Sequence, residues 1–219
     1  MKTQETIAVL ASGGLDSAIL IHNLLQKRTT VRPLYIQGGH VWENTELFWL
    51  RRFLKAVRSP RLKPLVVLSL KTGDLYDGHW SLTGKRVPGA SSRDRTVYLP
   101  GKNILLIAKA AVFCALQKIN FLALGPLETN PFPDAQPSFF KTMEKVLSAG
   151  LNHNIKILTP FLKLGKKEVM ALGVSLPLHL TFSCLSPRGR RHCGKCNKCA
   201  ERKKAFRQIG VTDPTHYHL

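Results

Sequence analysis

Acidic side chains are scarce in this chain of 219 residues, in which 13 Asp and Glu stand against 33 Lys and Arg. Long apolar runs are missing as well: no stretch approaches the roughly 20 residues that cross a bilayer, and no signal-peptide pattern is present. These absences argue against a membrane or secreted protein, and we expect a cytoplasmic one. In that reducing compartment the five cysteines are not expected to form disulfides.

The shortage of acids leaves two basic runs and a formal net charge of +20. Residues 51–63 carry six Lys and Arg with no acid, and residues 188–207 carry nine against Glu201 alone. Basic surfaces attract polyanions, so this charge could serve nucleic acid, another acidic macromolecule, or only small anionic ligands. An ordinary solvated surface is an equally good interpretation, because steering small charged ligands needs no polyanion site.

Two common phosphate-binding fingerprints are also absent. No Lys-Ser or Lys-Thr pair follows Gly13 and Gly14, which excludes a Walker loop, and no third glycine completes a dinucleotide fingerprint. What is present is an apolar run over residues 6–11, then Ser12-Gly13-Gly14-Leu15-Asp16-Ser17, then an amphipathic segment over residues 18–26. A strand, a glycine-rich turn and a helix N-terminus predict an anion site, because free N–H groups and the helix dipole point at the anion. A turn that merely needs glycine is the alternative.

Strand-like and helix-like patterns alternate along the chain. Apolar runs that suit buried strands recur at residues 6–11, 31–36, 64–70, 120–125 and 155–158, and helical periodicity fills 16–27, 42–58, 101–118, 137–149 and 165–172. This alternation predicts an α/β fold with a doubly wound parallel sheet, whose ligands bind beyond the carboxyl ends of the strands. We expect the main domain to span residues 1–175. The stretch 71–100 lacks periodicity and is expected to form a mobile loop or lid over the site.

Four of the cysteines gather near the end of the chain, at Cys184, Cys193, Cys196 and Cys199. Overlapping Cys-x-x-Cys spacings place sulfurs on one face of a metal, and four thiolates predict a closed, tetrahedral and therefore structural site. Zinc is favoured over an iron–sulfur cluster, which takes the same ligands, because tetrahedral thiolate sites are most often zinc. We expect residues 176–219 to form a small zinc-binding segment packed on the main domain. His192 is expected beside the ligands or exposed, and Cys114, in an apolar helical run, is expected in the core.

The segment Ser12-Gly13-Gly14-Leu15-Asp16-Ser17, placed after a first strand, resembles the PP-loop of the N-type ATP pyrophosphatases. These enzymes cleave ATP to AMP and pyrophosphate, and so adenylate an oxygen of their substrate. The resemblance implies that Ser12, Gly13, Gly14 and Ser17 hold pyrophosphate and that Asp16 helps to hold Mg²⁺. The full stretch that it assigns to ATP is Leu10, Ala11, Ser12, Gly13, Gly14, Leu15, Asp16 and Ser17.

Together with the cysteines, further motifs resemble the 7-cyano-7-deazaguanine synthase family, often called QueC, over most of the chain. They are Leu99-Pro100-Gly101-Lys102-Asn103, Phe132-Pro133-Asp134-Ala135-Gln136-Pro137, Thr159-Pro160-Phe161 with Gly165-Lys166-Lys167-Glu168, and Thr181-Phe182-Ser183-Cys184. The resemblance implies an ATP-dependent ligase that converts 7-carboxy-7-deazaguanine and ammonia to 7-cyano-7-deazaguanine, in queuosine biosynthesis, through adenylated intermediates. It implies ATP, Mg²⁺ and Zn²⁺ as cofactors, Asp16, Lys102 and Lys166 as catalytic residues, and Asn103 and Asp134 as substrate-binding residues.

Some positions depart from the family pattern. Glu128-Thr129-Asn130 replaces a longer stretch, Ala135 and Gln136 replace Cys and Arg, and Gln37-Gly38-Gly39-His40 is only loosely similar. One alternative is therefore a relative that joins the deazaguanine carboxylate to a protein amine, and another is an adenylating enzyme that acts on tRNA. A non-enzymatic zinc-ribbon nucleic-acid binder is a third, which the intact PP-loop disfavours. A homodimer is also compatible with the resemblance.

Overall fold

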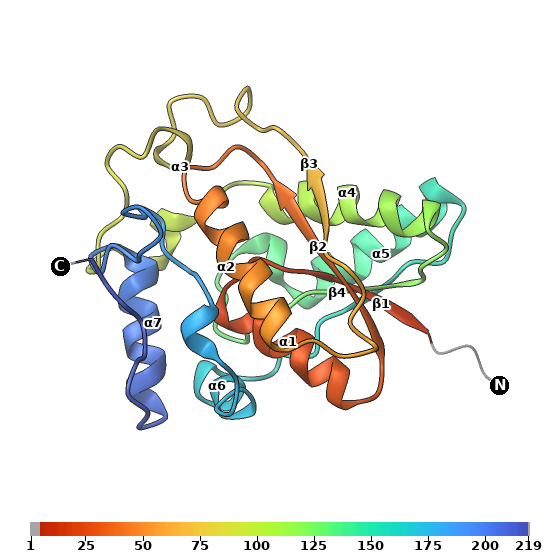
Figure 1. Ribbon diagram of the computed structural model, residues 1–219. Coiled ribbons are helices and arrows are strands. Elements are labelled where there is room, and N and C mark those ends of the chain that lie inside the picture. The colour runs from red at the N-terminus through yellow and green to blue at the C-terminus, as the bar shows by residue number, and fades with distance from the viewer. Residues whose placement is uncertain (1–4, 219) are drawn as a thin grey trace.

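Five parallel strands form the centre of the computed structural model, which describes residues 5–218 (Figure 1). Their order across the sheet is β3-β2-β1-β4-β5, with the bounds β1 Thr6–Leu10, β2 Thr30–Gln37, β3 Val66–Ser69, β4 Phe121–Ala123 and β5 Lys156–Leu158. β1 lies in the middle, where Ile7 pairs with Val31 of β2 and with Phe121 of β4. Helices cover both faces of such a sheet, which is why Ala8 and Val9 are fully buried and β1 reads as a continuous apolar run.

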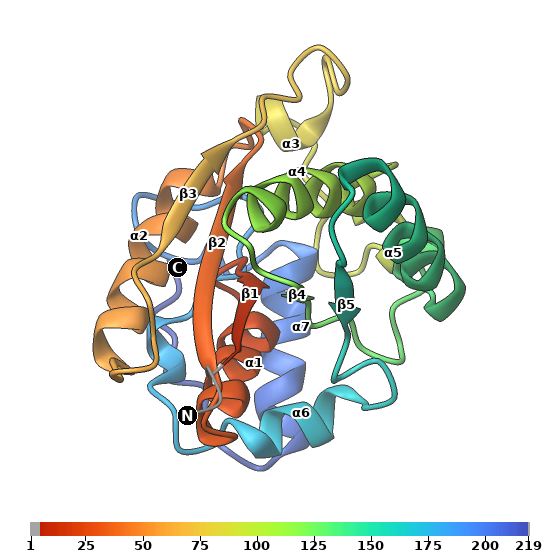
Figure 2. The same ribbon diagram turned by 90° about the vertical axis from the view of Figure 1, so that its right-hand side faces the viewer.

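Two layers of helices enclose the sheet (Figure 2). α1 (Leu15–Gln26), α2 (Glu43–Ala56) and α6 (Lys166–Leu172) pack with Val9 on one face, and α4 (Lys102–Leu116) and α5 (Pro137–Leu151) pack with Ala8 on the other. α7 (Asn197–Gln208) joins the first layer through Ala205 and Phe206. The doubly wound parallel fold predicted from the sequence is therefore confirmed. No helix within residues 5–218 is long and apolar enough to cross a membrane.

The sheet reverses its direction of growth between β1 and β4, and this position is where the site forms. The chain first builds outward from β1 to β2 and β3, and then returns past β1 to add β4 and β5. The connections leave β1 and β4 on opposite faces, so a crevice opens beyond their carboxyl ends. The glycine-rich turn after β1 lies there, and Gly125, which follows β4, lies against it: a Cβ added to Gly125 would be 3.5 Å from the carbonyl oxygen of Asp16.

The bounds of the five strands and of the five predicted helices, which are α1, α2, α4, α5 and α6, agree with the sequence prediction to within about two residues. The prediction omitted α7, because this segment is dominated by Lys, Arg and Glu and shows no apolar stripe. It also omitted short helical pieces: α3 Trp80–Thr83, and the 3₁₀ turns η1 Asp94–Val97, η2 Pro133–Ala135 and η3 Leu178–Leu180. α3 and η1 lie in the stretch 71–100, which crosses one end of the molecule beyond β3 (Figure 1). That this stretch moves as a lid stays a prediction.

Candidate active site

The glycine-rich turn between β1 and α1 has the geometry of an anion cradle. Gly13 has φ +75°, a left-handed conformation that favours glycine, and a Cβ there would lie 3.1 Å from Cγ of Glu46. The Ser17 hydroxyl accepts the Ser12 N–H at 3.2 Å and donates to the Gly14 carbonyl at 3.2 Å, which ties the turn to the first turn of α1. Gly14 caps α1 without a side-chain hydrogen bond, so the first N–H groups of the helix remain available to an anion.

Asp16 and Lys166, which are 150 residues apart, meet beside this turn. The Lys166 ammonium donates to both carboxylate oxygens of Asp16, at 2.9 and 2.8 Å, and forms an ion pair with Glu201 at 3.2 Å. Glu201 in turn pairs with Lys198 at 2.6 Å. Burial lowers the pKa of Lys166, but the two carboxylates outweigh it and raise this pKa above its ordinary value. Burial raises the pKa of Glu201, but Lys198 and Lys166 outweigh it and lower this pKa to about 2. Lys166 and Glu201 therefore stay charged near neutral pH.

Two cavities meet at the turn. The first, of about 300 Å³, lies beyond the ends of β1, β2 and β4. Its apolar wall has an aliphatic part, which includes Leu34, Ile36, Leu70 and Leu124, and an aromatic part, which includes Trp42, Tyr76 and Phe140. The second, of about 390 Å³, faces the cysteine-rich segment and has an aromatic wall formed by Trp80, Tyr98, Phe132 and Phe182. Ser12, Asp16, Lys102 and Asn103 line both cavities. A ligand in one cavity can therefore reach a ligand in the other across the glycine-rich turn over residues 12–17, which is called the phosphate turn below.

Lys102, Asn103 and Asp134 also meet at this junction. Asp134 is 5% exposed; its Oδ2 accepts the backbone N–H of Asn103 at 3.0 Å, and its carbonyl accepts the Asn103 side-chain amide at 2.8 Å. Lys102 opens α4 after Gly101, and its ammonium lies 5.4 Å from the centre of the Trp42 ring. Burial lowers the pKa of Lys102, although Glu46 and Glu43 act in the opposite direction. The three residues thus present a cation, an amide and a carboxylate to the second cavity.

The start of α2 adds acidic residues that the sequence analysis missed. Glu43 accepts the N–H groups of Gly38 and Gly39 at 2.7 and 2.9 Å, which fixes the turn after β2. Glu46 accepts the Tyr35 hydroxyl at 2.7 Å and lines both cavities. Burial raises the pKa of Glu46 to about 8, although the Tyr35 hydrogen bond and Lys102 oppose this shift. The signal in the sequence was the spacing of two acids, i and i+3, in the first turn of the predicted helix over residues 42–58.

His40 closes the first cavity on the same side. It is 8% exposed and stacks on Trp42, with ring centres 4.7 Å apart and an interplanar angle of 7°. Burial lowers the pKa of His40 to about 3, so its ring is neutral at physiological pH. Its Nδ1 has no hydrogen-bond partner among the described residues. His40 therefore contributes a neutral wall to the cavity, not a further cation.

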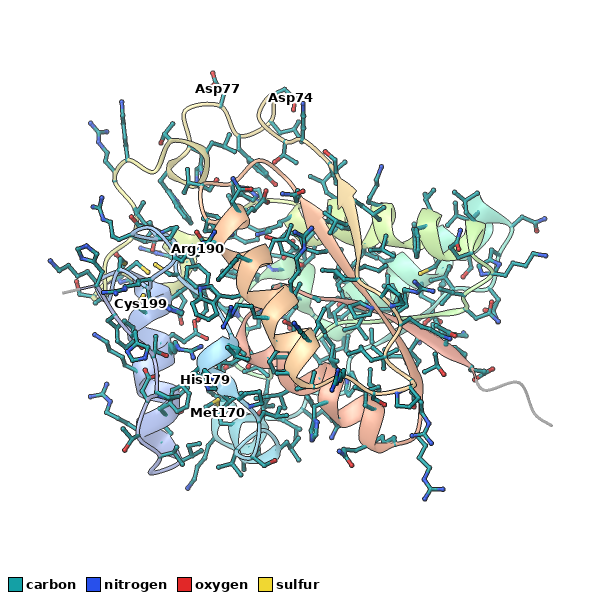
Figure 3. All side chains as sticks on the ribbon, in the orientation of Figure 1. Asp74, Asp77, Met170, His179, Arg190 and Cys199 are labelled. Carbon is teal, nitrogen blue, oxygen red and sulfur yellow. The ribbon has the colours of Figure 1, made fainter. Side chains whose placement is uncertain are left out.

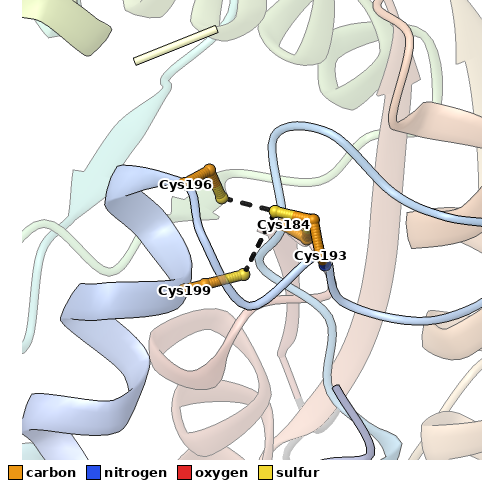
Figure 4. A group of neighbouring side chains, drawn as sticks. All are labelled: Cys184, Cys193, Cys196 and Cys199. Atoms are coloured by element: carbon orange, nitrogen blue, oxygen red, sulfur yellow. Dashed lines mark hydrogen bonds between the residues drawn. The ribbon is translucent and has the colours of Figure 1, made fainter. Parts of the chain in front are cut away.

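The four cysteines near the C-terminus form one buried cluster (Figure 4). The sulfurs of Cys184, Cys193, Cys196 and Cys199 all lie within 4.8 Å of one another, and two of the sulfur pairs are 3.9 Å apart. Four thiolates about 2.3 Å from a central zinc ion would be separated by about 3.8 Å, so the cluster fits a tetrahedral metal site. Backbone N–H groups of Cys193 and Leu185 point at the sulfurs of Cys184 and Cys196, at 3.2 and 3.4 Å, as expected around thiolates.

His192 and Cys114 are both buried, but only His192 lies beside the cluster. His192 is 4% exposed, and its Nε2 accepts the N–H of Ser183 at 3.2 Å, so it lies buried beside the ligands and not on the surface. Cys114 is fully buried on α4, and burial raises the pKa of its thiol to about 12. The prediction that Cys114 is a packed core residue is confirmed.

The two basic runs adjoin in space. The carbonyl of Arg190 accepts the Trp49 indole N–H at 2.8 Å, and that of Gly189 accepts the Thr45 hydroxyl at 3.2 Å, so this loop docks on α2. The guanidinium of Arg190 lies 4.0 Å from the centre of the Phe48 ring. Figure 3 shows Arg190 between α2 and the C-terminal segment. Gly189 and Arg190 of the second basic run therefore lie on α2, which carries the start of the first run, whereas Lys198 and Arg202 of the second run line the second cavity.

Comparisons with known proteins agree with this geometry. A family model described as "Queuosine biosynthesis protein QueC" matches residues 6–210. A 7-cyano-7-deazaguanine synthase of Leptospira interrogans is 31% identical over 220 residues, covering 94% of this chain and 88% of that protein. One from Methanococcus maripaludis is 28% identical, covering 97% and 98%.

Among solved structures, a predicted subunit of a tRNA methyltransferase from Methanocaldococcus jannaschii is similar with a TM-score of 0.51. It is 18% identical and covers 78% of this chain and 74% of its own, so it supports the fold alone. The family match, by contrast, includes the phosphate turn, both cavities and all four cysteines. The chain belongs to the queuosine biosynthesis protein QueC family.

Proposed function

We propose that the protein converts 7-carboxy-7-deazaguanine and ammonia to 7-cyano-7-deazaguanine, with ATP as the source of energy. The observation that carries this proposal is the match to the QueC family over residues 6–210. The names of the bacterial and archaeal relatives support the same reaction. The enzyme is then an ATP-dependent ligase of queuosine biosynthesis, and we expect it to act in the cytoplasm.

The first cavity suits ATP. The aliphatic part of its wall would hold the adenine, and the turn over residues 10–17 would hold the pyrophosphate with free N–H groups. Asp16 is the carboxylate for a Mg²⁺ ion that arrives with the phosphates, because magnesium sites combine one or two carboxylates with phosphate oxygens. Both Asp16 oxygens accept hydrogen bonds from Lys166. With Mg²⁺ bound at Asp16, Lys166 would be able to contact a phosphate, and its ion pair with Glu201 would keep it in place.

The second cavity suits the flat, bicyclic acid. Its aromatic wall offers rings on which a deazaguanine can stack, and Asp134 keeps one carboxylate oxygen that no described donor occupies. That oxygen fits the amino and imino N–H groups of a guanine edge, and the backbone N–H of Asn103 holds the other carboxylate oxygen in place. Lys102 stands at the junction, where it would stabilise the charge that develops on the α-phosphate oxygens as the carboxylate attacks phosphorus.

The chemistry explains why ATP is needed. A carboxylate oxygen is a poor leaving group, and adenylation turns it into part of AMP, a good one. Ammonia then displaces AMP to give the amide, a second ATP adenylates the amide oxygen, and loss of AMP leaves the nitrile. The protein's contribution is to hold the acid, the α-phosphate and the cations in line, which converts a bimolecular encounter into a positioned one.

The cysteine cluster would hold Zn²⁺ in a structural role. Four sulfur ligands complete a tetrahedral shell and leave no position for water, so this metal would not take part in the reaction. Its contribution would be to order the segment that carries Phe182, Ser183 and α7. In this sense we keep the division into residues 1–175 and 176–219 as a proposal, although Ala205 and Phe206 belong to the main core.

A direct assay tests the function. The purified, zinc-loaded protein is incubated with ATP, Mg²⁺ and 7-carboxy-7-deazaguanine, with and without ammonium, and the products are identified by mass spectrometry. We expect acid-dependent AMP release in the presence of ammonium and a product with the mass of the nitrile. Activation of the acid that yields no nitrile would overturn the synthase assignment and would direct the search to a protein or RNA acceptor.

A further inference from the structure

Glu46 lies at the junction of the two cavities, directly beneath the phosphate turn. It lines both cavities, and the turn packs so closely on it that a Cβ at Gly13 would meet both its Cγ and its carbonyl oxygen, at 3.1 and 3.2 Å. Its N–H donates to the carbonyl of Trp42 at 2.9 Å, within the first turn of α2. The backbone that carries this carboxylate is therefore held firmly at the place where the adenylated acid would sit.

Among the described carboxylates of the two cavities, Glu46 and Asp134 have no ion pair and keep an oxygen without a donor, and the free oxygen of Asp134 is the one assigned above to the guanine edge. Asp16 and Glu201 are paired with Lys166, Glu43 accepts two backbone N–H groups, and Asp134 accepts the N–H of Asn103. Within residues 5–218, Glu46 has no Lys, Arg or His nitrogen at ion-pair distance. The Tyr35 hydroxyl occupies Oε2, and no described donor reaches Oε1.

The surroundings favour a monovalent nitrogen cation over a metal. The Trp42 ring, one helical turn before Glu46, already faces the ammonium of Lys102 at 5.4 Å, so this region accommodates such a group. A Mg²⁺ ion would need about six oxygen ligands, whereas Glu46 is hydrogen-bonded to the Tyr35 hydroxyl, its neighbour Glu43 already accepts two backbone N–H groups, and Lys102 is a cation. The charge on Lys102 would also repel a divalent ion twice as strongly as a monovalent one.

We propose that Glu46 binds the ammonium ion that supplies the nitrogen and accepts a proton from it, so that ammonia is released beside the acyl adenylate. This assignment rests on the proposed function and adds a residue to it. The nitrogen lone pair forms the new C–N bond at the acyl carbon, and the C–O bond to AMP breaks, so that AMP leaves with the electron pair. Glu46 holds the proton taken from ammonium until it returns it to solvent, and the second proton lost as the amide forms also passes to solvent.

The charged and titratable groups around Glu46 suit this role. Burial raises its pKa to about 8, closer to that of ammonium than an ordinary carboxyl, and Glu43 on the same helix raises it too. Lys102 of α4 and the hydroxyl of Tyr35 of β2 oppose the shift. The carboxylate is therefore a stronger base than usual and gains most from a cation partner.

Glu46→Gln tests the assignment in the zinc-loaded protein. Glutamine keeps an oxygen to accept the Tyr35 hydroxyl but carries no charge and takes no proton. Ammonium chloride is titrated while amide or nitrile formation is followed, and acid-dependent exchange of labelled pyrophosphate into ATP is measured separately without ammonium. We expect the KM for ammonium to rise by about tenfold or more, with the exchange rate and the KM for ATP unchanged.

The dependence of kcat/KM for ammonium on pH gives a second test. This dependence would not change if Glu46 had only a structural role. In the wild type, kcat/KM for ammonium should rise with pH as Glu46 loses its proton. The fraction of free ammonia also rises with pH, so Glu46→Gln should keep that rise but lack the separate limb that follows the pKa of Glu46. Tyr35→Phe should move this limb to higher pH, because the Tyr35 hydrogen bond lowers the pKa of Glu46. The matched control Glu144→Gln removes a carboxylate of α5 that pairs with Lys156 outside the cavities, and it should change neither the profile nor the KM.

Unchanged ammonium dependence in Glu46→Gln, or an unmoved limb in Tyr35→Phe, would overturn the assignment. If Glu46→Gln needs more Mg²⁺ but keeps its KM for ammonium, the assignment is also overturned, and Glu46 is instead a ligand of a divalent metal. If Glu46→Gln fails to fold, the pH profile of Tyr35→Phe tests the assignment: a limb at higher pH supports it, and an unmoved limb overturns it. Absence of acid-dependent pyrophosphate exchange in the wild type would instead overturn the proposed function itself, and the ammonium assignment with it.

Discussion

Lys166→Met removes the cation that Asp16 and Glu201 share and replaces it with a side chain of similar length. In the wild type the Lys166 ammonium contacts both Asp16 oxygens and Glu201, and its side chain is only 15% exposed. The carboxylates are more accessible, at 28% for Asp16 and 37% for Glu201, so water screens part of their repulsion once the cation is gone.

The expected loss of stability lies between two known limits. Removing one partner of a fully buried ion pair costs about 3–5 kcal/mol, and an exposed pair contributes about 0–1 kcal/mol. With these intermediate exposures we expect about 2 kcal/mol, which corresponds to a drop in Tm of about 4–8 °C for a chain of this size. ATP cleavage should also fall, because Lys166 is proposed to contact a phosphate.

Chemical denaturation of the zinc-loaded protein measures this difference, and Lys156→Met is the matched control. Lys156 forms a single ion pair with Glu144 at 2.8 Å, and its side chain is 50% exposed, so its replacement should cost about 0.5 kcal/mol or less. Equal losses in the two variants would refute the reasoning, since they would mean that the Asp16–Lys166–Glu201 network is no stronger than an ordinary surface pair.

Three further outcomes follow from the site. Asp16→Ala should abolish pyrophosphate release while a cooperative unfolding transition remains; retained activity would remove Asp16 from the metal role. Cys196→Ser should release zinc, measured by a chelating dye, and expose the C-terminal segment to proteolysis; a metal-replete, equally resistant variant would contradict the structural-zinc assignment. Burial raises the pKa of Glu46 to about 8, so the native state binds this proton more tightly than the unfolded state does. The contribution of Glu46 to the free energy of unfolding should therefore decrease as the pH rises from about 4.5 to 8. Glu46→Gln should therefore be increasingly more stable than the wild type over that range, and a pH-independent difference would contradict the shift.

The strands were predictable because a parallel sheet buries both of its faces. Each strand then reads as a short apolar run, and helical periodicity between the runs gives the alternation that defines the fold. Ala8 and Val9 illustrate this: both are fully buried although their side chains point to opposite faces of the sheet. α7 gave no such signal, because only Ala205 and Phe206 reach the main core from a helix otherwise rich in Lys and Arg.

The site was only partly predictable, for a different physical reason. The phosphate turn and the cysteine spacing are local in sequence, so their residues were identified directly. The contact between Asp16 and Lys166 joins α1 to α6 across 150 residues, and no local pattern indicates that the two candidates pair with each other. The sequence did not indicate Glu46 either, because acids are common in the first turn of a helix. Its position beneath Gly13, which distinguishes it, is visible only in the folded structure.

The arrangement also connects the cysteine cluster to the two cavities. α7 begins directly after Cys196, contains Cys199, and carries Lys198 and Glu201 on the turns between the cluster and the core. Glu201 in turn holds Lys166 against Asp16, so a chain of direct contacts runs from the cysteine cluster to the phosphate turn. Cys184 itself lines the second cavity, next to Phe182 and Ser183. Loss of the metal would therefore free both the wall of the substrate cavity and the carboxylate that positions Lys166, and activity should fall before the main core unfolds.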